Sequence, residues 1–144
     1  MTKKKYLADV NFWLALAFHK HRHHSKAQAW LDGLSNDLCC FCRMTQQGFL
    51  RLATNPQAHH AGAVPMNRAW ELYDSLRADL RIAFHDEPTD IEPIWRTLTH
   101  GDSFSPHVWN DAYLAAFAQL ADLEVVTFDR GFTKYTGVKC TLLT

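Results

Sequence analysis

At residues 5–18 the chain reads KYLADVNFWLALAF, a short apolar segment that meets a carboxylate and then continues into a longer apolar segment. Residues 6–8, together with Val10, predict a strand, because the run is apolar and contains no breaker. Residues 12–18 are all apolar, which is typical of a helix that is buried on nearly every side. Asn11 is the expected amino cap of that helix.

Asp9 is the polar residue that interrupts this stretch. It follows the expected strand, and open α/β sheets bind their ligands at the carboxyl ends of their strands. A purely structural role in the strand-to-helix turn is an equal alternative for a single aspartate.

The composition is that of an ordinary globular chain without net charge. The chain has 144 residues, of which 47% are hydrophobic and 21% charged, which predicts one domain over residues 1–144. Fifteen acidic side chains cancel fifteen basic ones, so attraction to a nucleic acid has to come from a local basic patch. No apolar run approaches the roughly 20 residues of a membrane span, and the basic start of the chain lacks a signal-peptide cleavage site. We expect a cytoplasmic protein that does not enter a membrane.

Two clusters of potential metal ligands lack the spacing of a metal site. Cys39, Cys40 and Cys42 fall in one expected strand, where 40 and 42 share a side, and Cys140 is remote in sequence. Zinc sites usually start from a Cys-x-x-Cys pair, so we expect buried free thiols instead. Residues 19–24 hold four histidines, for which we expect a solvated or RNA-facing cationic loop, with a specific metal site as the less favoured alternative.

Helical and strand patterns alternate along the rest of the chain. Helices are expected over residues 27–34, 43–53, 66–81, 89–98 and 106–122, and strands over residues 38–42, 82–84, 123–128 and 138–143. Thr45 is the expected amino cap of the helix over 43–53. In the last helix, Trp109, Tyr113, Phe117 and Leu120 form the expected core face. This alternation predicts an α/β fold with a parallel sheet covered on both faces.

Three aspartates are expected at the same edge of that sheet. Asp9 and Asp129 each follow a strand, and Asp111 lies in the first turns of the last helix. In a parallel sheet the carboxyl ends of the strands and the amino ends of the helices share one edge, so the three carboxylates can converge. Such carboxylates suit Mg²⁺ or Mn²⁺, which can activate a water molecule for phosphodiester hydrolysis. Separate capping roles for each aspartate are the alternative.

At these residues the chain resembles the PIN domain, and most closely the VapC toxins of bacterial toxin–antitoxin pairs. The resemblance runs from about Tyr6 to the carboxyl terminus. The segments that carry it are Leu7–Asn11, Thr45–Arg51, Asn55-Pro56, Asn110–Leu114 and Val126–Phe132. It implies a PIN-like three-layer α/β/α sandwich with a central, mostly parallel sheet of four or five strands.

The same resemblance implies an endoribonuclease that depends on Mg²⁺ or Mn²⁺, cleaves tRNA or ribosomal RNA, and is neutralised by a cognate VapB-like antitoxin. By position, Asp9, Asp111 and Asp129 match the metal-binding aspartates of the family. Asn11 and Thr127 match the polar positions that flank them.

Further surface roles follow from the family. Arg130 matches a basic residue near the site and could contact RNA phosphate, although an exposed turn arginine can equally be only solvated. Proteins of this family commonly form homodimers. Four aromatic residues could contribute to such surfaces or could belong to the core: Trp30, Trp70, Tyr73 and Trp95.

One position departs from the family pattern. The family usually has a glutamate where this chain has Gln46, and an amide brings neither charge nor a base to a metal site. An active ribonuclease therefore competes with a second hypothesis, a PIN fold that binds RNA or an antitoxin but cleaves inefficiently. A different phosphate-handling α/β enzyme is disfavoured, because the chain has no Gly-rich phosphate loop.

Overall fold

The strands form one parallel sheet with β1 at its centre. In the computed structural model, which describes residues 3–58 and 62–144, the strand order is β3-β2-β1-β4-β5. All neighbouring pairs are parallel. The strands are β1 (Lys5–Ala8), β2 (Leu38–Phe41), β3 (Ile82–Phe84), β4 (Glu124–Thr127) and β5 (Cys140–Leu142). Because all five run in the same direction, their carboxyl ends meet at one edge, and the expected parallel sheet is confirmed.

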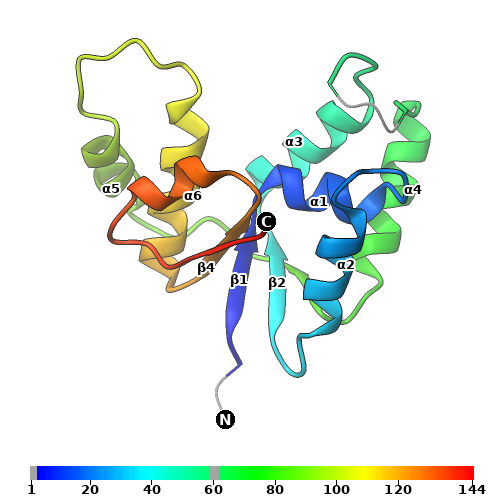
Figure 1. The fold of residues 1–144 in the computed structure, drawn as a ribbon. Coiled ribbons are helices and arrows are strands. Elements are labelled where there is room, and N and C mark those ends of the chain that lie inside the picture. Colours follow the sequence, from blue (N-terminus) through cyan, green and yellow to red (C-terminus); the bar gives the residue numbers. More distant parts are fainter. Residues whose placement is uncertain (1–2, 59–61) are drawn as a thin grey trace.

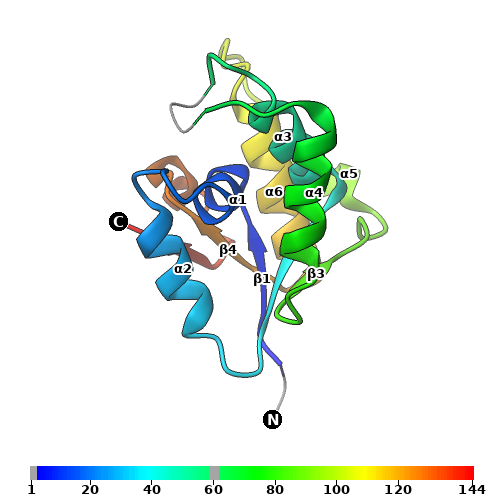
Figure 2. The same ribbon diagram turned by 90° about the vertical axis from the view of Figure 1, so that its right-hand side faces the viewer.

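Helices cover both faces of the sheet (Figures 1 and 2). One face carries α1 (Val10–Ala17), α2 (His24–Asp32), α3 (Arg43–Ala53) and α4 (Met66–Arg77), and the other carries α5 (Ile91–Leu98) and α6 (Val108–Ala121). Side chains of β1 alternate between the two cores, since Tyr6 and Ala8 pack under α1 whereas Leu7 packs under α6. The three-layer α/β/α sandwich is therefore confirmed. No helix in the described ranges is both long and apolar enough to span a membrane.

The junction between β1 and α1 differs from the sequence prediction by one residue. Val10, expected in the strand, is the first residue of α1, and Asp9 is its amino cap, with Oδ1 accepting a hydrogen bond of 2.8 Å from the Val10 amide. The prediction that Asn11 caps the helix was wrong. Aspartate and asparagine cap helices about equally well, and the sheet decides between them because it ends at Ala8. The segment Phe12–Leu16 is buried throughout, as expected.

The start of α3 also differs from the prediction. The amino cap is Cys42 rather than Thr45, and Thr45 is the third helical residue, whose hydroxyl accepts a hydrogen bond of 2.9 Å from the Cys42 amide. Cys39 packs in the core under α1, whereas Cys42 packs in the core under α6, on the side of Leu7, the register partner of Cys40. The predicted shared side of Cys40 and Cys42 is therefore confirmed. All four cysteines are free thiols, and three of them are buried.

The expected core face of α6 is only partly correct. Phe117 is fully buried, but Trp109 is 55% exposed and Leu120 is 38% exposed. The buried residues of α6 are the alanines 112, 115, 116 and 118, together with Leu114 and Phe117. Alanines let the helix backbone approach the sheet closely, which leaves the large side chains of the flanking positions outside.

The four aromatic residues for which both a core and a surface role were considered divide between core and surface. Tyr73 is buried, and Trp30 and Trp95 are partly buried against the two cores. Trp70 is half exposed on α4.

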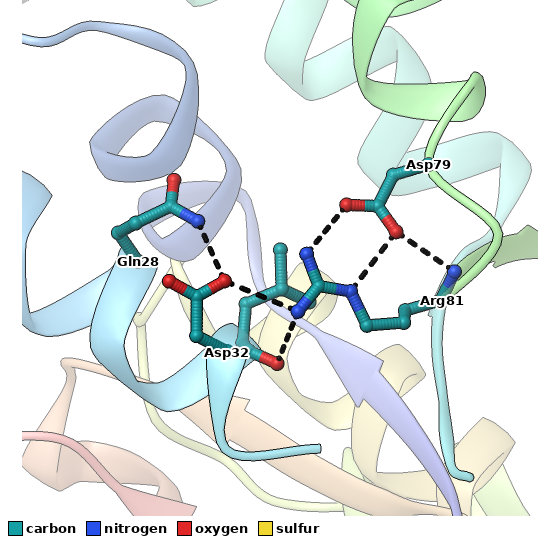
Figure 3. A network of polar contacts seen from close by, with 5 residues as sticks. Gln28, Asp32, Asp79 and Arg81 are labelled. Carbon is teal, nitrogen blue, oxygen red and sulfur yellow. Dashed lines mark hydrogen bonds and ion pairs between the residues drawn. The ribbon is translucent and has the colours of Figure 1, made fainter. Parts of the chain in front are cut away.

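A turn held by Arg81 ends α4 earlier than the predicted residue 81. The Asp79 carboxylate accepts hydrogen bonds from the Arg81 amide, Nε and Nη2 at 2.8–3.0 Å. Figure 3 shows the same guanidinium reaching α2, where Nη1 donates to the Leu31 carbonyl and to Asp32 at 3.1 Å. Gln28 also donates to Asp32 at 3.0 Å. This network joins the end of α2 to the start of β3, so it fixes two sequence-distant segments at the amino edge of the sheet.

Candidate active site at the carboxyl edge

Asp9 and Thr127 lie side by side where β1 and β4 end. The Asp9 amide donates a hydrogen bond of 2.9 Å to the Val126 carbonyl, which continues the pairing of the two strands past Ala8. The Thr127 hydroxyl then donates to Asp9 Oδ2 at 2.9 Å. With the Val10 amide on Oδ1, both carboxylate oxygens of Asp9 have a fixed hydrogen-bond partner. The orientation of this carboxylate is therefore set by the backbone and by a buried hydroxyl.

Asn11 and Asp129 complete the hydrogen-bond network around Thr127. The Asn11 amide nitrogen donates to the Thr127 hydroxyl oxygen at 3.2 Å, and its amide oxygen accepts from the Phe128 backbone at 3.2 Å. The Asp129 amide donates to the same hydroxyl at 3.0 Å. Thr127 is completely buried. The two polar positions predicted to flank the aspartates thus hold the start of α1 and the end of β4 together.

The three aspartates lie close enough to influence one another electrostatically. The pKa of Asp9 is raised to about 6, mainly by burial and less by the charges of Asp111 and Asp129, against the opposing hydrogen bonds from Val10 and Thr127. Burial also raises the pKa of Asp111, as does the charge of Asp129. Like charges that disfavour ionisation of their neighbours create a place where a cation is favourable. These contributions agree with the prediction that the three side chains lie at one edge of the sheet, and their convergence on one cation stays a prediction.

Asp111 and Asp129 are each positioned by a helical segment. Asp111 lies in the first turn of α6, where the helix amides favour negative charge. Asp129 precedes a short 3₁₀ helix, η1 (Arg130–Lys134), and its carboxylate accepts a hydrogen bond of 2.9 Å from the Gly131 amide. The nearby cations Lys134 and His107 act on Asp111 in the opposite direction, towards a lower pKa. Arg130 is exposed directly after Asp129.

Gln46 lies at the same edge, but its amide is directed to a different partner. It is buried in the first turns of α3, just after β2 ends. Its Oε1 accepts a hydrogen bond of 2.5 Å from Arg43 Nη1. No hydrogen bond joins Gln46 to the three aspartates within residues 3–58 and 62–144. Gln46 lies just after a strand end, as predicted.

The donor chemistry of this edge fits a hydrated divalent cation. Mg²⁺ prefers carboxylate oxygens, keeps several waters and needs only one or two protein carboxylates. In the part of the chain that the structure describes, no three His, Cys, Asp or Glu side chains are already grouped tightly enough to hold an ion. Asp9 is the carboxylate best prepared as a ligand, because its orientation is fixed on both oxygens.

The histidine cluster is part of this edge through one contact. His23 stacks on Phe128 with ring centroids 4.6 Å apart, and Phe128 lies between Thr127 and Asp129. Burial lowers the pKa of His23, and the charges of Arg22 and Lys26 lower it further. The loop before α2 is therefore packed against the end of β4, and the described part of it forms no group of metal ligands.

Two side-chain hydrogen bonds at this edge were not predicted from the sequence. Arg43 lies three positions before Gln46, a spacing at which helical side chains meet, so this pair could have been found. The Tyr113 hydroxyl donates a hydrogen bond of 2.5 Å to Glu87, which ties the segment after β3 to α6. Nothing in the sequence indicates this second pairing, because the two residues come from different elements.

Comparison with known proteins gives consistent family matches. The PIN domain family model matches residues 6–138. Ribonuclease VapC41 of Mycobacterium tuberculosis is 45% identical over 142 residues, which cover 95% of this chain and 97% of that protein. Ribonuclease VapC44 of the same organism is 32% identical over 130 residues, covering 86% of this chain and 85% of that protein.

Solved structures agree on the fold. VapBC2 from Rickettsia felis, bound to a DNA fragment from its promoter, has a TM-score of 0.71 at 12% identity and covers 97% of this chain and 99% of that chain. VapC20 of Mycobacterium tuberculosis, described as a sarcin-ricin loop cleaving toxin, has a TM-score of 0.66 at 18% identity, with 91% and 95% covered. These low identities support the fold alone.

Proposed function

Because the chain belongs to the PIN-domain family and, within it, to the VapC ribonucleases, we propose that it is an endoribonuclease toxin that uses Mg²⁺ or Mn²⁺ held by Asp9, Asp111 and Asp129. The observation that carries this proposal is the placement of the three carboxylates: Asp9 and Asp129 follow the neighbouring parallel strands β1 and β4, and Asp111 lies in the first turn of α6. A cluster of negative charge at the carboxyl ends of parallel strands is a suitable place for a cation and for a phosphodiester.

Different residues of the chain would orient the metal ligand and contact the RNA at this site. A bound divalent cation supplies a water of lowered pKa and stabilises charge on the leaving oxygen. Thr127 and the Val10 amide hold the Asp9 carboxylate in one orientation, and Asn11 holds Thr127. Arg130 is exposed next to Asp129, where its guanidinium can contact a phosphate of the RNA.

The proposed activity is tested with an Asp9→Asn variant. Asn keeps the size of the side chain but removes its charge, so cleavage of total RNA in Mg²⁺ or Mn²⁺ should fall to the level seen with EDTA. Asp122→Asn is the matched control, because Asp122 is exposed at the opposite end of α6 and has a left-handed conformation that asparagine tolerates. Unchanged cleavage by Asp9→Asn would reject the proposal.

The proposed substrate class is tRNA or ribosomal RNA. Support comes from the relatives, one of which is described as cleaving the sarcin-ricin loop. Incubating purified tRNA and ribosomal RNA separately with the protein, and mapping the new RNA ends, distinguishes the two. Cuts scattered over both RNAs without preference would contradict a defined target.

A second function is favoured by one observation at Gln46. Its neutral amide is bonded to Arg43 and not to an aspartate, so the site has one carboxylate fewer than the usual family pattern. In this alternative the protein binds RNA or an antitoxin and cleaves inefficiently. Gln46→Glu should then raise Mn²⁺ affinity in calorimetry, and the cleavage rate, by about tenfold or more. No gain in either quantity would remove this alternative.

An antitoxin is the proposed protein partner, and the groove between α1, α2 and α4 is its proposed binding surface. The groove has a volume of about 330 Å³, and its apolar lining includes Leu16, Leu31, Leu72, Leu76 and Ile82. An amphipathic helix of a partner fits such a surface. Leu72→Asp should abolish co-purification of a small companion protein from the native host, whereas Leu80→Asp should not, because Leu80 is 94% exposed outside the groove.

A homodimer is the proposed assembly. Phe104 is fully exposed and Trp109 is 55% exposed beside a pocket of about 440 Å³, and an apolar surface of this kind favours a protein contact. Light scattering should give twice the mass of the chain, and a Phe104→Ser/Trp109→Ser variant should give the mass of one chain. A monomeric parent protein would contradict this part of the proposal.

A further inference from the structure

We propose that Arg43 and Gln46 form a binding subsite for a phosphate group of the RNA strand, with Arg77 as a second cation. This inference rests on the proposed ribonuclease function and gives Gln46 a role as a hydrogen-bond donor. The Gln46 amide can donate a hydrogen bond to a phosphate, which the glutamate usual in the family could not do.

The hydrogen bond between the two residues leaves only donors to face a ligand. The oxygen of the Gln46 amide accepts from Arg43 Nη1, so the NH₂ group is the part of the amide still able to bind. This NH₂ group bonds to no other described residue and is not among the fully buried unpaired polar atoms. Gln46 itself is only 7% exposed, which means that the NH₂ group reaches water from an otherwise buried side chain.

The arginines are held in place by an aromatic ring and not by carboxylates. The Arg43 guanidinium lies 4.8 Å from the centroid of Phe84, and the Arg77 guanidinium lies 5.9 Å from the same centroid. Arg77 also donates to the Tyr73 hydroxyl at 2.9 Å. Neither arginine belongs to an ion pair among the described residues.

Nearby acidic residues do not neutralise this pair of cations. Asp74 lies about one turn before Arg77 on α4 and forms no ion pair with it among the described residues. Glu87, in the segment after β3, accepts a hydrogen bond from the Tyr113 hydroxyl. The amino end of α3 adds the positive end of a helix dipole beside Arg43. Two cations and an amide NH₂, without a compensating carboxylate, are the donor set for an anion.

The position of the pair identifies the anion as a backbone phosphate. Gln46 follows β2, and β2 is the direct neighbour of β1, whose carboxyl end carries Asp9. Neighbouring strands are about 5 Å apart. An RNA strand that reaches the aspartates therefore passes within side-chain reach of Gln46 and Arg43, so the phosphates beside the reacting one can bind there.

The test is RNA binding without cleavage, measured by fluorescence anisotropy in EDTA with a labelled single-stranded RNA oligonucleotide at several salt concentrations. Arg43→Ala and Gln46→Glu should each weaken binding by about tenfold at low salt, and Arg43→Ala should reduce the salt slope by about one. Gln46→Glu acts by placing a carboxylate against Arg43, which cancels its charge. Arg77→Ala should weaken binding less, because Arg77 is farther from Gln46.

Arg51→Ala is the matched control, because Arg51 is an exposed arginine on the same helix, about 12 Å farther along its axis. It should bind RNA like the parent protein. Thermal melting verifies that each variant is folded. If Arg43→Ala does not fold, Gln46→Glu and Arg77→Ala decide the question.

Failure of the phosphate subsite and failure of the proposed ribonuclease function give different results in these experiments. Equal RNA affinity of Arg43→Ala, Gln46→Glu and the parent protein would overturn the subsite, even if cleavage in Mg²⁺ is normal. Tighter binding by Gln46→Glu would overturn it as well. Cleavage that survives Asp9→Asn rejects the proposed function and leaves the binding result to be judged separately.

Discussion

The hydroxyl of Thr127 donates a hydrogen bond of 2.9 Å to the carboxylate of Asp9, from a position 118 residues later in the chain. The same hydroxyl oxygen accepts hydrogen bonds from Asn11 and from the Asp129 amide. One buried side chain therefore orients Asp9 and fixes the backbone that carries Asp129. The geometry of the proposed metal site depends on a residue that binds no metal itself.

Thr127→Val should impair both stability and cleavage. Valine has the shape of threonine but removes the partner of the Asn11 amide nitrogen, the Asp129 amide and Oδ2 of Asp9, which costs about 1–3 kcal/mol of unfolding free energy. We expect the cleavage rate to fall at least tenfold, since the Asp9 carboxylate is then oriented by the Val10 amide alone. Urea unfolding and single-turnover cleavage measure the two effects. Thr133→Val, at an exposed threonine of η1, is the control and should change neither.

The contribution of Asp9 to the stability of the metal-free protein should rise as the pH falls from 7.5 to 5. The pKa of Asp9 is about 6 in the folded chain, above its ordinary value of 3.8, so the folded state binds the proton more tightly than the unfolded state. Ionised Asp9 thus destabilises the fold above pH 6, and protonation relieves up to about 3 kcal/mol. Urea midpoints measured in EDTA across this range test the expectation.

The Asp9→Asn variant isolates this effect from that of other groups such as His23, whose lowered pKa acts on stability in the opposite direction. It should be more stable than the parent protein at pH 7.5, and the difference should shrink as the pH approaches 5. Parallel stability curves for the two proteins would show that Asp9 does not titrate near 6. The range ends at pH 5 because Asp79 and Glu124 have lowered pKa values and lose their stabilising charge in more acidic solution.

Gly48→Ala should destabilise the protein although alanine favours helices. A Cβ atom at Gly48 would lie 2.7 Å from Cγ2 of Val10, where α3 crosses α1. Overpacking of this kind costs about 1–3 kcal/mol. Val10→Ala in the same chain should restore most of the loss, so a double-mutant cycle should give a coupling of about 1 kcal/mol or more. Gly101→Ala, which meets no atom within 4 Å, is the control.

Arg81→Ala should destabilise the fold without a direct effect on the site. It removes the guanidinium that binds Asp79, Asp32 and the Leu31 carbonyl (Figure 3). The side chain is about one third exposed, and we expect a loss of about 1–3 kcal/mol in urea unfolding. Arg96→Ala should cost less than about 0.5 kcal/mol, because the Arg96–Glu92 pair is largely exposed. Equal losses for the two variants would contradict a structural role of Arg81.

The sequence alone determined the class of the fold and the position of the aspartates along it. Apolar runs such as Phe12–Leu16 and the strand over Glu124–Thr127 follow from local patterns, because burial and backbone pairing leave a periodic mark. A parallel sheet then brings Asp9 and Asp129 to one edge whatever the details of packing.

Tertiary structure alone decided which neighbours these side chains have. The choice of Asp9 over Asn11 as the helix cap depends on where β1 stops pairing. The exposure of Trp109 depends on how closely the alanines of α6 approach the sheet. The bond from Thr127 to Asp9 joins positions from opposite ends of the chain. Such contacts leave no local pattern in the sequence, because they depend on the order of strands in the sheet and on the shapes of the surfaces that meet.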